Sequence, residues 1–269
     1  MIKVDQIQQF LSSLDSDWKY PDDTVDTIKS GNPDKEVTGI AVGWMSYWWA
    51  LKKAVALSCN LFITHEPTYF NHHDTDEQIL QFPEVKAKQQ YINDEQIIIL
   101  RCHDLWDHLE GLGIVDSWGK FLGFSTQING NEFTRIYNGD SLTAGEIAAM
   151  IAMKTSSLGL EAVQLIGPAD RIVHRFAIGT GAITPFMEWI YEFQIDLAVC
   201  TDDGIEYWRD GALAIDLELP IIVVNHPVSE EAGVIQLSKT LQKQFPSIPV
   251  HHIPQNSNFT LVFPQDYQT

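Results

Sequence analysis

Short aliphatic runs of strand length alternate with helix-sized segments along this chain, and this alternation restricts the possible folds more than any other feature. In the first half, strands are predicted at residues 37–42, 61–64 and 96–102, with helices between them at residues 47–58 and 76–93. Strand–helix alternation of this kind builds a buried sheet of mostly parallel strands. The first half is therefore predicted to be an α/β layer.

The same alternation returns after residues 125–131, a Gly/Asn/Ser/Gln stretch that is typical of a linker. Strands are predicted there at residues 133–137, 162–166, 175–178, 197–201 and 221–224, and helices at residues 141–157, 185–193, 204–217 and 234–245. The remaining predictions are a helix at residues 4–14, a loop at 15–35, a short helix at 118–122, and last strands at 251–253 and 259–263.

The two α/β blocks are similar in size, and 269 residues is the length of about two domains at roughly 100–200 residues each. We therefore predict an α/β fold of two lobes with a metal cleft between them. The predicted limits are residues 1–127 for lobe one, completed by residues 226–269, and residues 128–225 for lobe two.

The charge balance excludes one class of partner. Acidic residues outnumber basic residues 36 to 17, for a formal net charge of −19. A surface of this sign repels the phosphate backbone, so no nucleic-acid partner is expected. The simpler interpretation of the acidic surface is that it is solvated and keeps the protein soluble, rather than that it binds a partner.

The distribution of apolar residues and cysteines points to the cytoplasm. No apolar run approaches the ~20 residues that span a bilayer, so no membrane partner is expected. The first residues lack the basic and apolar regions of a signal peptide. Cys59, Cys102 and Cys200 lie far apart and form no CxxC pair, which is typical of reduced thiols.

Histidine and carboxylate residues are concentrated directly after three of the predicted strands. In chain order, the three clusters hold His65 and Glu66, then His103 and Asp107, then His226 and Glu230. In open α/β sheets, ligands bind beyond the carboxyl ends of the strands. The three clusters are therefore predicted to converge on one crevice.

The residue types in these clusters are those of a metal site. Imidazole and carboxylate together suit Zn, Mn and Fe(II), whereas shells of oxygen alone suit Mg and Ca. Pro227 favours the first turn of a helix, so His226 lies at the helix start with Glu230 one turn further on the same face. His103 and Asp107 are also four residues apart. Glu230 is thus placed to bridge two cations.

Each feature has a structural alternative. A single histidine after a strand, such as His65, is more often a hydrogen-bonded structural residue than a ligand. Carboxylates at a helix start, such as Glu230, commonly complement the helix dipole. His72 and His73 form a loop cluster that could touch the site, whereas the pair at residues 251–252 is expected to be structural.

Other motifs give weaker or negative indications. The turn Gly179-Thr180-Gly181 could cradle a phosphate, but two glycines are weak evidence. The chain has no HExxH, GxSxG or GxxxxGK[ST] motif, which removes support for zincin, serine hydrolase and P-loop interpretations. The aromatic run at residues 44–49 is predicted to be an oligomer contact.

The three clusters resemble motifs of the NGG-interacting-factor-three-like family, whose bacterial members are often labelled GTP cyclohydrolase type two homologues. The matching segments, in the family's order, are Ile63-Thr64-His65-Glu66-Pro67, His103-Asp104-Leu105-Trp106-Asp107 and Asn225-His226-Pro227-Val228-Ser229-Glu230. The family usually has a second histidine where Glu66 stands, and a Thr-Gly-Glu-like turn where Asp202-Asp203-Gly204 stands. The resemblance runs from about Asp26 to the C-terminus.

The resemblance implies a dinuclear metal centre between two α/β lobes, and a hexameric ring as the homo-oligomer. The ligands that it implies are His65, Asp107, His226 and Glu230, with Glu66 in the position of the missing histidine. Two divalent ions per chain are expected, with Zn, Mn and Fe as the candidates.

Two functions are compatible with such a centre. The leading hypothesis is a hydrolase acting on a small nucleotide-like or phosphorylated substrate. Its candidate catalytic residues are Glu230, as a bridging ligand, and His103, which, or else Asp104, can orient a ligand without binding the metal itself. The alternative is a metal-binding adaptor or metal-handling protein without catalysis. Catalysis requires an open coordination position and a substrate-sized cavity, which an adaptor does not need.

Overall fold

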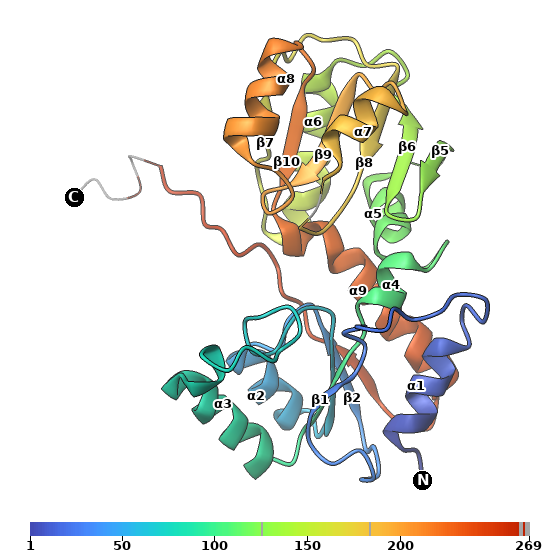
Figure 1. The fold of residues 1–269 in the computed structure, drawn as a ribbon, viewed down its shortest axis with the longest axis vertical. Helices are drawn as coiled ribbons and strands as arrows, with labels where there is room; N and C mark the ends of the chain where they lie inside the picture. The colour runs from blue at the N-terminus through green and yellow to red at the C-terminus, as the bar shows by residue number, and fades with distance from the viewer. Residues whose placement is uncertain (125, 183, 264–265, 267–269) are drawn as a thin grey trace. The chain divides into compact units, whose positions relative to one another are not determined.

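The computed structural model describes residues 1–124, 126–182, 184–263 and 266, and it divides into two compact units (Figure 1). Unit 1 comprises Met1–Ser117 and Glu231–Gln255, and unit 2 comprises Trp118–Glu230 and Asn256–Thr269. Each unit has its own sheet with helices beside it, so the predicted α/β class with two lobes is confirmed. The predicted lobe limits at residues 127/128 and 225/226 stay a prediction.

Unit 1 is built on a five-stranded sheet with the strand order β1-β4-β3-β2-β11. The strands are β1 Ile28–Ser30, β2 Ile40–Gly43, β3 Leu61–Thr64, β4 Ile98–Arg101 and β11 Val250–His252. Four of them run parallel, and only β1 pairs antiparallel, at the edge. Every residue of β2, β3 and β4 is buried, as expected for parallel strands that are covered on both faces.

Alternate strand residues of unit 1 point to two separate cores. On one face, Ile63 and Leu100 join a cluster with residues of α1 (Val4–Ser12), α4 (Asp104–His108) and α9 (His226–Gln244). On the other face, Phe62 and Ile99 pack against α2 (Trp48–Ala56) and α3 (Pro83–Asp94). The short 3-10 helix η1, Ile79–Gln81, precedes α3.

A lysine lies buried inside unit 1. Lys88, on α3, donates a hydrogen bond from Nζ to the carbonyl of Thr68 at 2.7 Å, and its Nζ is 3.5 Å from Ser46 Oγ. Burial disfavours the charged form and lowers the pKa of Lys88 to about 8, although the charge of Asp74 opposes this shift. The lysine helps to hold the loop that follows β3.

This lowered pKa predicts that stability rises with pH in a window between about pH 8 and pH 10.5. Within that window the folded chain has released the proton of Lys88 while the unfolded chain still binds it, so rising pH favours folding. We expect urea unfolding to show the wild type gaining about 2–3 kcal/mol relative to Lys88→Met between pH 7.5 and pH 10. Parallel stability profiles of the two proteins would contradict this assignment.

Unit 2 is built on a six-stranded sheet with the strand order β5-β6-β8-β9-β10-β7. The strands are β5 Gln127–Asn131, β6 Thr134–Asn138, β7 Gln164–Ile166, β8 Arg175–Ile178, β9 Leu197–Thr201 and β10 Ile221–Val224. The three central strands β8, β9 and β10 are parallel, and the outer strands pair antiparallel to them or to each other.

Helices of unit 2 cover this sheet. The helices are α5 Ile114–Leu122, which begins in unit 1, α6 Ala144–Thr155, η2 Ser156–Leu158, α7 Phe186–Tyr191, the π-helix η3 Tyr207–Gly211 and α8 Ala212–Asp216. Residues of α7 and α8 share one core with the sheet, in which Trp189 is fully buried. Its indole Nε1 donates to Thr134 Oγ1 at 3.0 Å, which satisfies the polar atom of this core residue.

Several predicted elements differ from the structure. The predicted linker at residues 125–131 is wrong, because Gln127–Asn131 is the edge strand β5, which has a single apolar residue, Ile128, and so no apolar alternation; Ser125 lies outside the described residues. The strand predicted at residues 259–263 is also wrong: these residues are assigned to no strand, since no described strand pairs with them. Helix α9 begins at His226, eight residues before its predicted start at residue 234.

The aromatic run at residues 44–49 divides between the core and the surface. Trp44 is 5% exposed and belongs to a core cluster of unit 1, whereas Trp48 and Trp49 are 37% and 48% exposed. An oligomer contact through Trp48 and Trp49 stays a prediction. Cys59, Cys102 and Cys200 are buried free thiols. Within the part of the chain that the structure describes, no helix combines the length and the apolar character needed to cross a membrane.

Candidate metal centre

The ends of β3 and β4 bring two histidines together in unit 1. These strands are parallel neighbours with Thr64 opposite Arg101, so the residues that follow them emerge side by side. His65 comes directly after β3, and His103 comes two residues after β4. Their rings stack with the centroids 4.8 Å apart, although the two residues are distant in sequence. The parallel register of β3 and β4 therefore explains why His65 and His103 lie together, as their positions after strand ends predict.

Asp107 completes this group. Helix α4 places Asp107 one turn after His103, and its N–H donates to the His103 carbonyl at 2.8 Å. Asp107 Oδ1 lies 3.2 Å from His65 Nε2, and its Oδ2 lies 3.5 Å from His103 Nε2. The ligand atoms that these three residues offer all lie within 4.8 Å of one another, close enough to hold one cation. We call these three residues the unit 1 group.

The other ring nitrogen of each histidine in the unit 1 group is held by an acceptor. His65 Nδ1 lies 3.1 Å from the carbonyl of Cys102, and His103 Nδ1 lies 2.9 Å from Asp104 Oδ1. A carbonyl can only accept, so the proton of a neutral His65 resides on Nδ1 and the lone pair on Nε2. Metal-binding histidines are oriented in this way by a hydrogen bond at the second nitrogen.

Two residues from the loop before β1 hold the segment that carries His103. Asp26 accepts the backbone N–H groups of His103, Asp104 and Leu105 at 2.6, 3.0 and 2.9 Å. Thr24 Oγ1 donates to Asp104 Oδ2 at 2.7 Å. The N–H groups at the start of α4, which have no partner within the helix, are thus satisfied by Asp26. These contacts fix the orientation of the helix that presents Asp107.

The local charges shift the pKa of two of these residues. Burial lowers the pKa of His103, but the charge of Asp107 and the hydrogen bond to Asp104 outweigh it, so the net shift is upward. Burial raises the pKa of Asp104, but hydrogen bonds from His103, Thr24 and the Val25 N–H together lower it well below its usual range. An acidic environment that attracts a proton to imidazole attracts a metal cation for the same reason.

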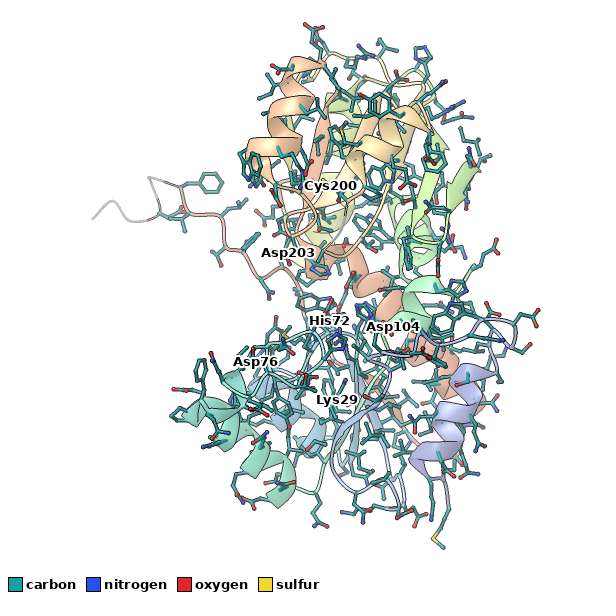
Figure 2. All side chains as sticks on the ribbon, in the orientation of Figure 1. Lys29, His72, Asp76, Asp104, Cys200 and Asp203 are labelled. Atoms are coloured by element: carbon teal, nitrogen blue, oxygen red, sulfur yellow. The ribbon has the colours of Figure 1, made fainter. Side chains whose placement is uncertain are left out.

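Glu66 lies beside an arginine in unit 1. Its Oε2 lies 3.2 Å from Nη2 of Arg101, the last residue of β4, and both side chains are largely buried. His72, from the loop after β3, contacts His103 with ring centroids 5.6 Å apart in an edge-on arrangement. Figure 2 labels His72, from the loop after β3, and Asp104, the first residue of α4, which follows β4.

Unit 2 carries a second group of ligand types, again at strand ends. β9 and β10 are parallel with Thr201 opposite Val224, so the loops that follow them are adjacent. His226 is the first residue of α9, and its Nε2 lies 3.0 Å from Glu230 Oε1, one helical turn later. We call His226 and Glu230 the unit 2 group.

The loop after β9 holds His226 in place. Asp203, which is labelled in Figure 2, belongs to this loop, and its Oδ2 lies 2.9 Å from His226 Nδ1. The hydrogen bond to His226 is the largest cause of the lowered pKa of Asp203. Asp202 Oδ1 accepts the backbone N–H of His226 at 2.8 Å, and its Oδ2 accepts Asn225 Nδ2 at 2.9 Å. The pair of aspartates therefore orients both the ring and the main chain.

The glycine turn after β8 also reaches the unit 2 group. Gly181 has a φ of +75°, and a Cβ placed there would lie 3.5 Å from Glu230 Oε1. Its carbonyl accepts a hydrogen bond from Thr201 Oγ1 at 2.5 Å. A side chain at this position would be strained by the positive φ. The turn thus packs closely against the carboxylate of Glu230, which is 1% exposed.

The structure places the predicted site residues in three arrangements. His65 and Asp107 share the unit 1 group with His103; Glu66 pairs with Arg101; and His226 and Glu230 share the unit 2 group. Their roles as metal ligands and catalytic residues stay predictions. The histidines at residues 251–252 were expected to be structural. His252 fits this expectation, because its Nε2 lies 2.9 Å from Oε1 of the buried Glu231.

Asp26, Arg101 and Asp203 were not among the predicted site residues. Asp26 acts on His103 from 77 residues away, and nothing in its local sequence signals that contact. Asp203 follows a strand, so its position at a strand end was the one available signal.

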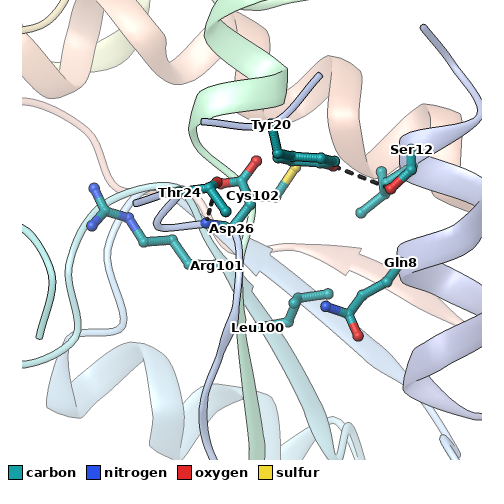
Figure 3. Close-up of a pocket in the computed structure, with 9 residues that line it drawn as sticks. Gln8, Ser12, Tyr20, Thr24, Asp26, Leu100, Arg101 and Cys102 are labelled. Carbon is teal, nitrogen blue, oxygen red and sulfur yellow. Dashed lines mark hydrogen bonds between the residues drawn. The ribbon is translucent and has the colours of Figure 1, made fainter. Parts of the chain in front are cut away.

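A cavity of about 230 Å³ lies in unit 1 at the end of β4, and no residue of the unit 1 group lines it (Figure 3). It is lined by residues of α1, of the loop before β1 and of the end of β4, among them Tyr20, Asp26 and Cys102. Tyr20 accepts a hydrogen bond from Ser12 at 3.3 Å, and burial raises the pKa of Tyr20 to about 12. Small-molecule sites usually have about 300–1,000 Å³. The cavity is therefore smaller than a typical substrate site.

Comparison with known proteins finds a family match and several similar structures. The model of the family Duf34/NIF3 (NGG1p interacting factor 3) matches residues 2–258. No curated protein matches the chain in sequence.

Three solved structures illustrate the likeness. The hypothetical protein SA1388 of Staphylococcus aureus has a TM-score of 0.80 at 18% identity, covering 97% of this chain and 99% of that one. A Bacillus cereus protein related to NIF3 has a TM-score of 0.81 at 14% identity, with the same coverage of 97% and 99%. Reduced HcgD from Methanocaldococcus jannaschii has a TM-score of 0.73 at 14% identity, covering 94% and 98%. At these identities the likeness establishes the fold.

Proposed function

The chain belongs to the Duf34/NIF3 (NGG1p interacting factor 3) family, and from this premise we propose that it is a dinuclear-metal-dependent hydrolase of a small nucleotide-like or phosphorylated molecule. The unit 1 group and the unit 2 group serve one centre of two divalent ions, with Zn, Mn or Fe as the metal. The protein works in the cytoplasm as a homo-oligomer, in a hexameric ring.

One observation carries this proposal. His65, His103 and His226 each have Nδ1 within 2.9–3.1 Å of an acceptor, and each has Nε2 within 3.0–3.5 Å of a carboxylate oxygen. An isolated structural histidine has no need of this shared arrangement. It is the arrangement that orients imidazole toward a cation, with an acceptor behind the ring and a carboxylate beside the ligating nitrogen.

The donor set also fits the proposed metals. Neutral imidazole nitrogen and carboxylate oxygen together suit Zn, Mn and Fe(II). The three histidines are buried or half-buried, and so are their carboxylate partners Asp107 and Glu230, which means that a bound cation would offset the charge of these carboxylates. A cluster of carboxylates without a cation would repel itself in such surroundings.

The residues around the groups have separable roles in the proposed reaction. When bound, a pair of divalent ions supplies Lewis acidity and lowers the pKa of water. Asp104 and Asp203 hold His103 and His226 by their Nδ1 atoms, so that Nε2 stays directed at the neighbouring carboxylate. The turn at Gly181 packs against Glu230, whose burial keeps its carboxylate away from bulk water.

The test of hydrolysis is a substrate screen with protein of known metal content. Chain loaded with Zn, Mn or Fe is incubated with a panel of phosphorylated and nucleotide compounds, and product release is measured with and without a chelator. We expect turnover that the chelator abolishes and that the same metal restores. A fully loaded protein that turns over no compound in the panel would contradict the hydrolase.

The second candidate function is a metal-binding adaptor without catalysis, and two observations favour it. The cavity at the end of β4, at about 230 Å³, is smaller than a typical substrate site of about 300–1,000 Å³, and no residue of the unit 1 group lines it. Trp48 and Trp49 are exposed and form an aromatic surface of the kind found at protein contacts. An adaptor predicts full metal loading, no turnover, and loss of partner binding when Trp49 is replaced by Ser.

A further inference from the structure

Arg101 is a buried arginine whose guanidinium nitrogens all contact the loop after β3, which begins with His65. Its side chain is 1% exposed. Nε donates to the carbonyl of His65 at 2.8 Å, Nη1 donates to the carbonyl of His72, and Nη2 lies 3.2 Å from Glu66 Oε2. One side chain therefore holds the start and the middle of the loop after β3 and pairs with the carboxylate of Glu66 between these two points.

A buried guanidinium requires compensation for its lost hydration. Burial lowers the pKa of Arg101, and the charges of Glu66, Asp74, Asp26 and Asp104 act in the opposite direction. Glu66 comes first among these opposing charges, and it is the one in direct contact. The planar fork of arginine serves three acceptors at fixed angles, which the point charge of a lysine does not. The contact with Glu66 is thus part of how the arginine is accommodated.

The same contact changes what Glu66 can offer a cation. A free carboxylate is a hard, negatively charged ligand that suits ions such as Mn²⁺, whereas imidazole suits Zn²⁺. Replacing imidazole by carboxylate therefore shifts the preference of a site toward Mn²⁺. Glu66 and His65 offer ligand atoms that lie within 4.8 Å of each other, so Glu66 is within reach of a metal bound at His65. Arg101 takes a share of the carboxylate's charge through Oε2, so Glu66 presents a weaker oxygen donor to that metal. The balance between hard oxygen and imidazole nitrogen at the unit 1 group therefore depends on Arg101.

We propose that Arg101 is a specificity-determining residue that sets the metal preference of the unit 1 group through its ion pair with Glu66. Arg101 attenuates the carboxylate and biases the group toward borderline ions such as Zn²⁺, and away from harder ions such as Mn²⁺. It also positions His65 through the His65 carbonyl. This inference rests on the proposed metal site, and it assigns a cause for which ion that site selects.

The test is a double-mutant cycle read out by metal binding rather than by activity. Dissociation constants of Zn²⁺ and Mn²⁺ are measured by competition with a chromophoric chelator for the wild type, Arg101→Gln, Glu66→Gln and the double variant. We expect Arg101→Gln to shift the Zn²⁺-to-Mn²⁺ preference about tenfold toward Mn²⁺, within the range of changes at residues that support metal ligands. In the Glu66→Gln background the same substitution should leave the preference unchanged.

Two further variants separate preference from folding. Arg101→Lys keeps a positive charge near Glu66, so its preference should lie close to that of the wild type even if affinity for both ions falls. Arg135→Gln is the matched control, because Arg135 is a buried arginine of unit 2 whose Nη1 donates to the carbonyls of Asn131, Glu132 and Thr134. It should not change the preference.

The outcomes separate this inference from the proposed function. If the wild type binds neither ion, the metal site itself fails. If the wild type binds metal but Arg101→Gln weakens Zn²⁺ and Mn²⁺ equally, Arg101 is only a structural support and the inference is overturned. A shift that persists in the Glu66→Gln background would also overturn it, because the effect would not pass through Glu66.

Discussion

Replacing His226 by Ala, or His65 by Ala, is expected to remove both metal ions from the protein. Each histidine offers Nε2 beside a carboxylate, Glu230 Oε1 at 3.0 Å and Asp107 Oδ1 at 3.2 Å. Loss of the nitrogen leaves that carboxylate without its partner ligand, and two ions that share a bridging ligand depend on each other. We expect about two equivalents of metal per chain in the wild type, and less than a tenth of that in either variant, by inductively coupled plasma mass spectrometry.

The matched control is His174→Ala. His174 also lies near a carboxylate, with Nδ1 3.5 Å from Asp196 Oδ2, but its side chain is 72% exposed and belongs to neither ligand group. Its removal should leave the metal content unchanged. If His226→Ala kept one full equivalent and His65→Ala kept the other, two independent mononuclear sites would replace the shared centre. A metal-free wild type that takes up no added Zn, Mn or Fe would contradict metal binding altogether.

Asp203→Ala is expected to weaken metal binding by about 10- to 100-fold while the fold persists. Asp203 holds His226 through Nδ1 at 2.9 Å, and without it the ring can rotate or place its proton on Nε2. Asp203→Asn keeps an acceptor and loses only the charge, so its affinity should lie between the wild type and the alanine variant. Nitrogen-15 NMR of the imidazole gives a readout that does not depend on activity: the population with the proton on Nε2 should rise in Asp203→Ala.

Asp170→Ala serves as the control for this series, because Asp170 is an exposed aspartate of the same unit. Its affinity and its tautomer populations should match the wild type. An Asp203→Ala variant with wild-type affinity would mean that packing alone orients His226. The role given to the acceptor behind the ring would then be withdrawn for all three histidines.

Much of the candidate site could be predicted from the sequence because parallel strands end together. His65 and His103 each follow a strand, and the register of β3 with β4 places their rings in contact. The spacing of His226 and Glu230 predicts one helix face, and α9 provides it. In each case a local pattern, either a strand end or a four-residue interval, carries enough information to locate the side chains.

The supporting residues could not be predicted, because their contacts are long-range and their local sequence is ordinary. Asp26 lies in a segment that the sequence indicates only as a loop, yet it accepts three N–H groups at the start of α4. Arg101 ends a buried strand, where an apolar residue would be the usual expectation. Only the folded register reveals that its guanidinium faces the His65 loop.

The misassigned elements have related causes. β5 is an edge strand whose one apolar side chain, Ile128, is exposed, and its stability comes from pairing with β6 rather than from an apolar pattern. Residues 259–263 have the composition of a strand but no described partner strand. Pairing depends on the neighbouring chain segment, so composition alone predicted one strand too many and missed two, β1 and β5.

Anomalous diffraction from crystals grown with Mn²⁺ or Zn²⁺ tests the central claim most directly, because it locates each ion relative to named atoms. We predict two peaks about 3.5–4 Å apart, the separation typical of two-metal sites. One peak should lie within bonding distance of His65 Nε2 and Asp107, and the other within bonding distance of His226 Nε2. Peaks at other residues, or no peak beside these atoms in fully loaded protein, would contradict the account.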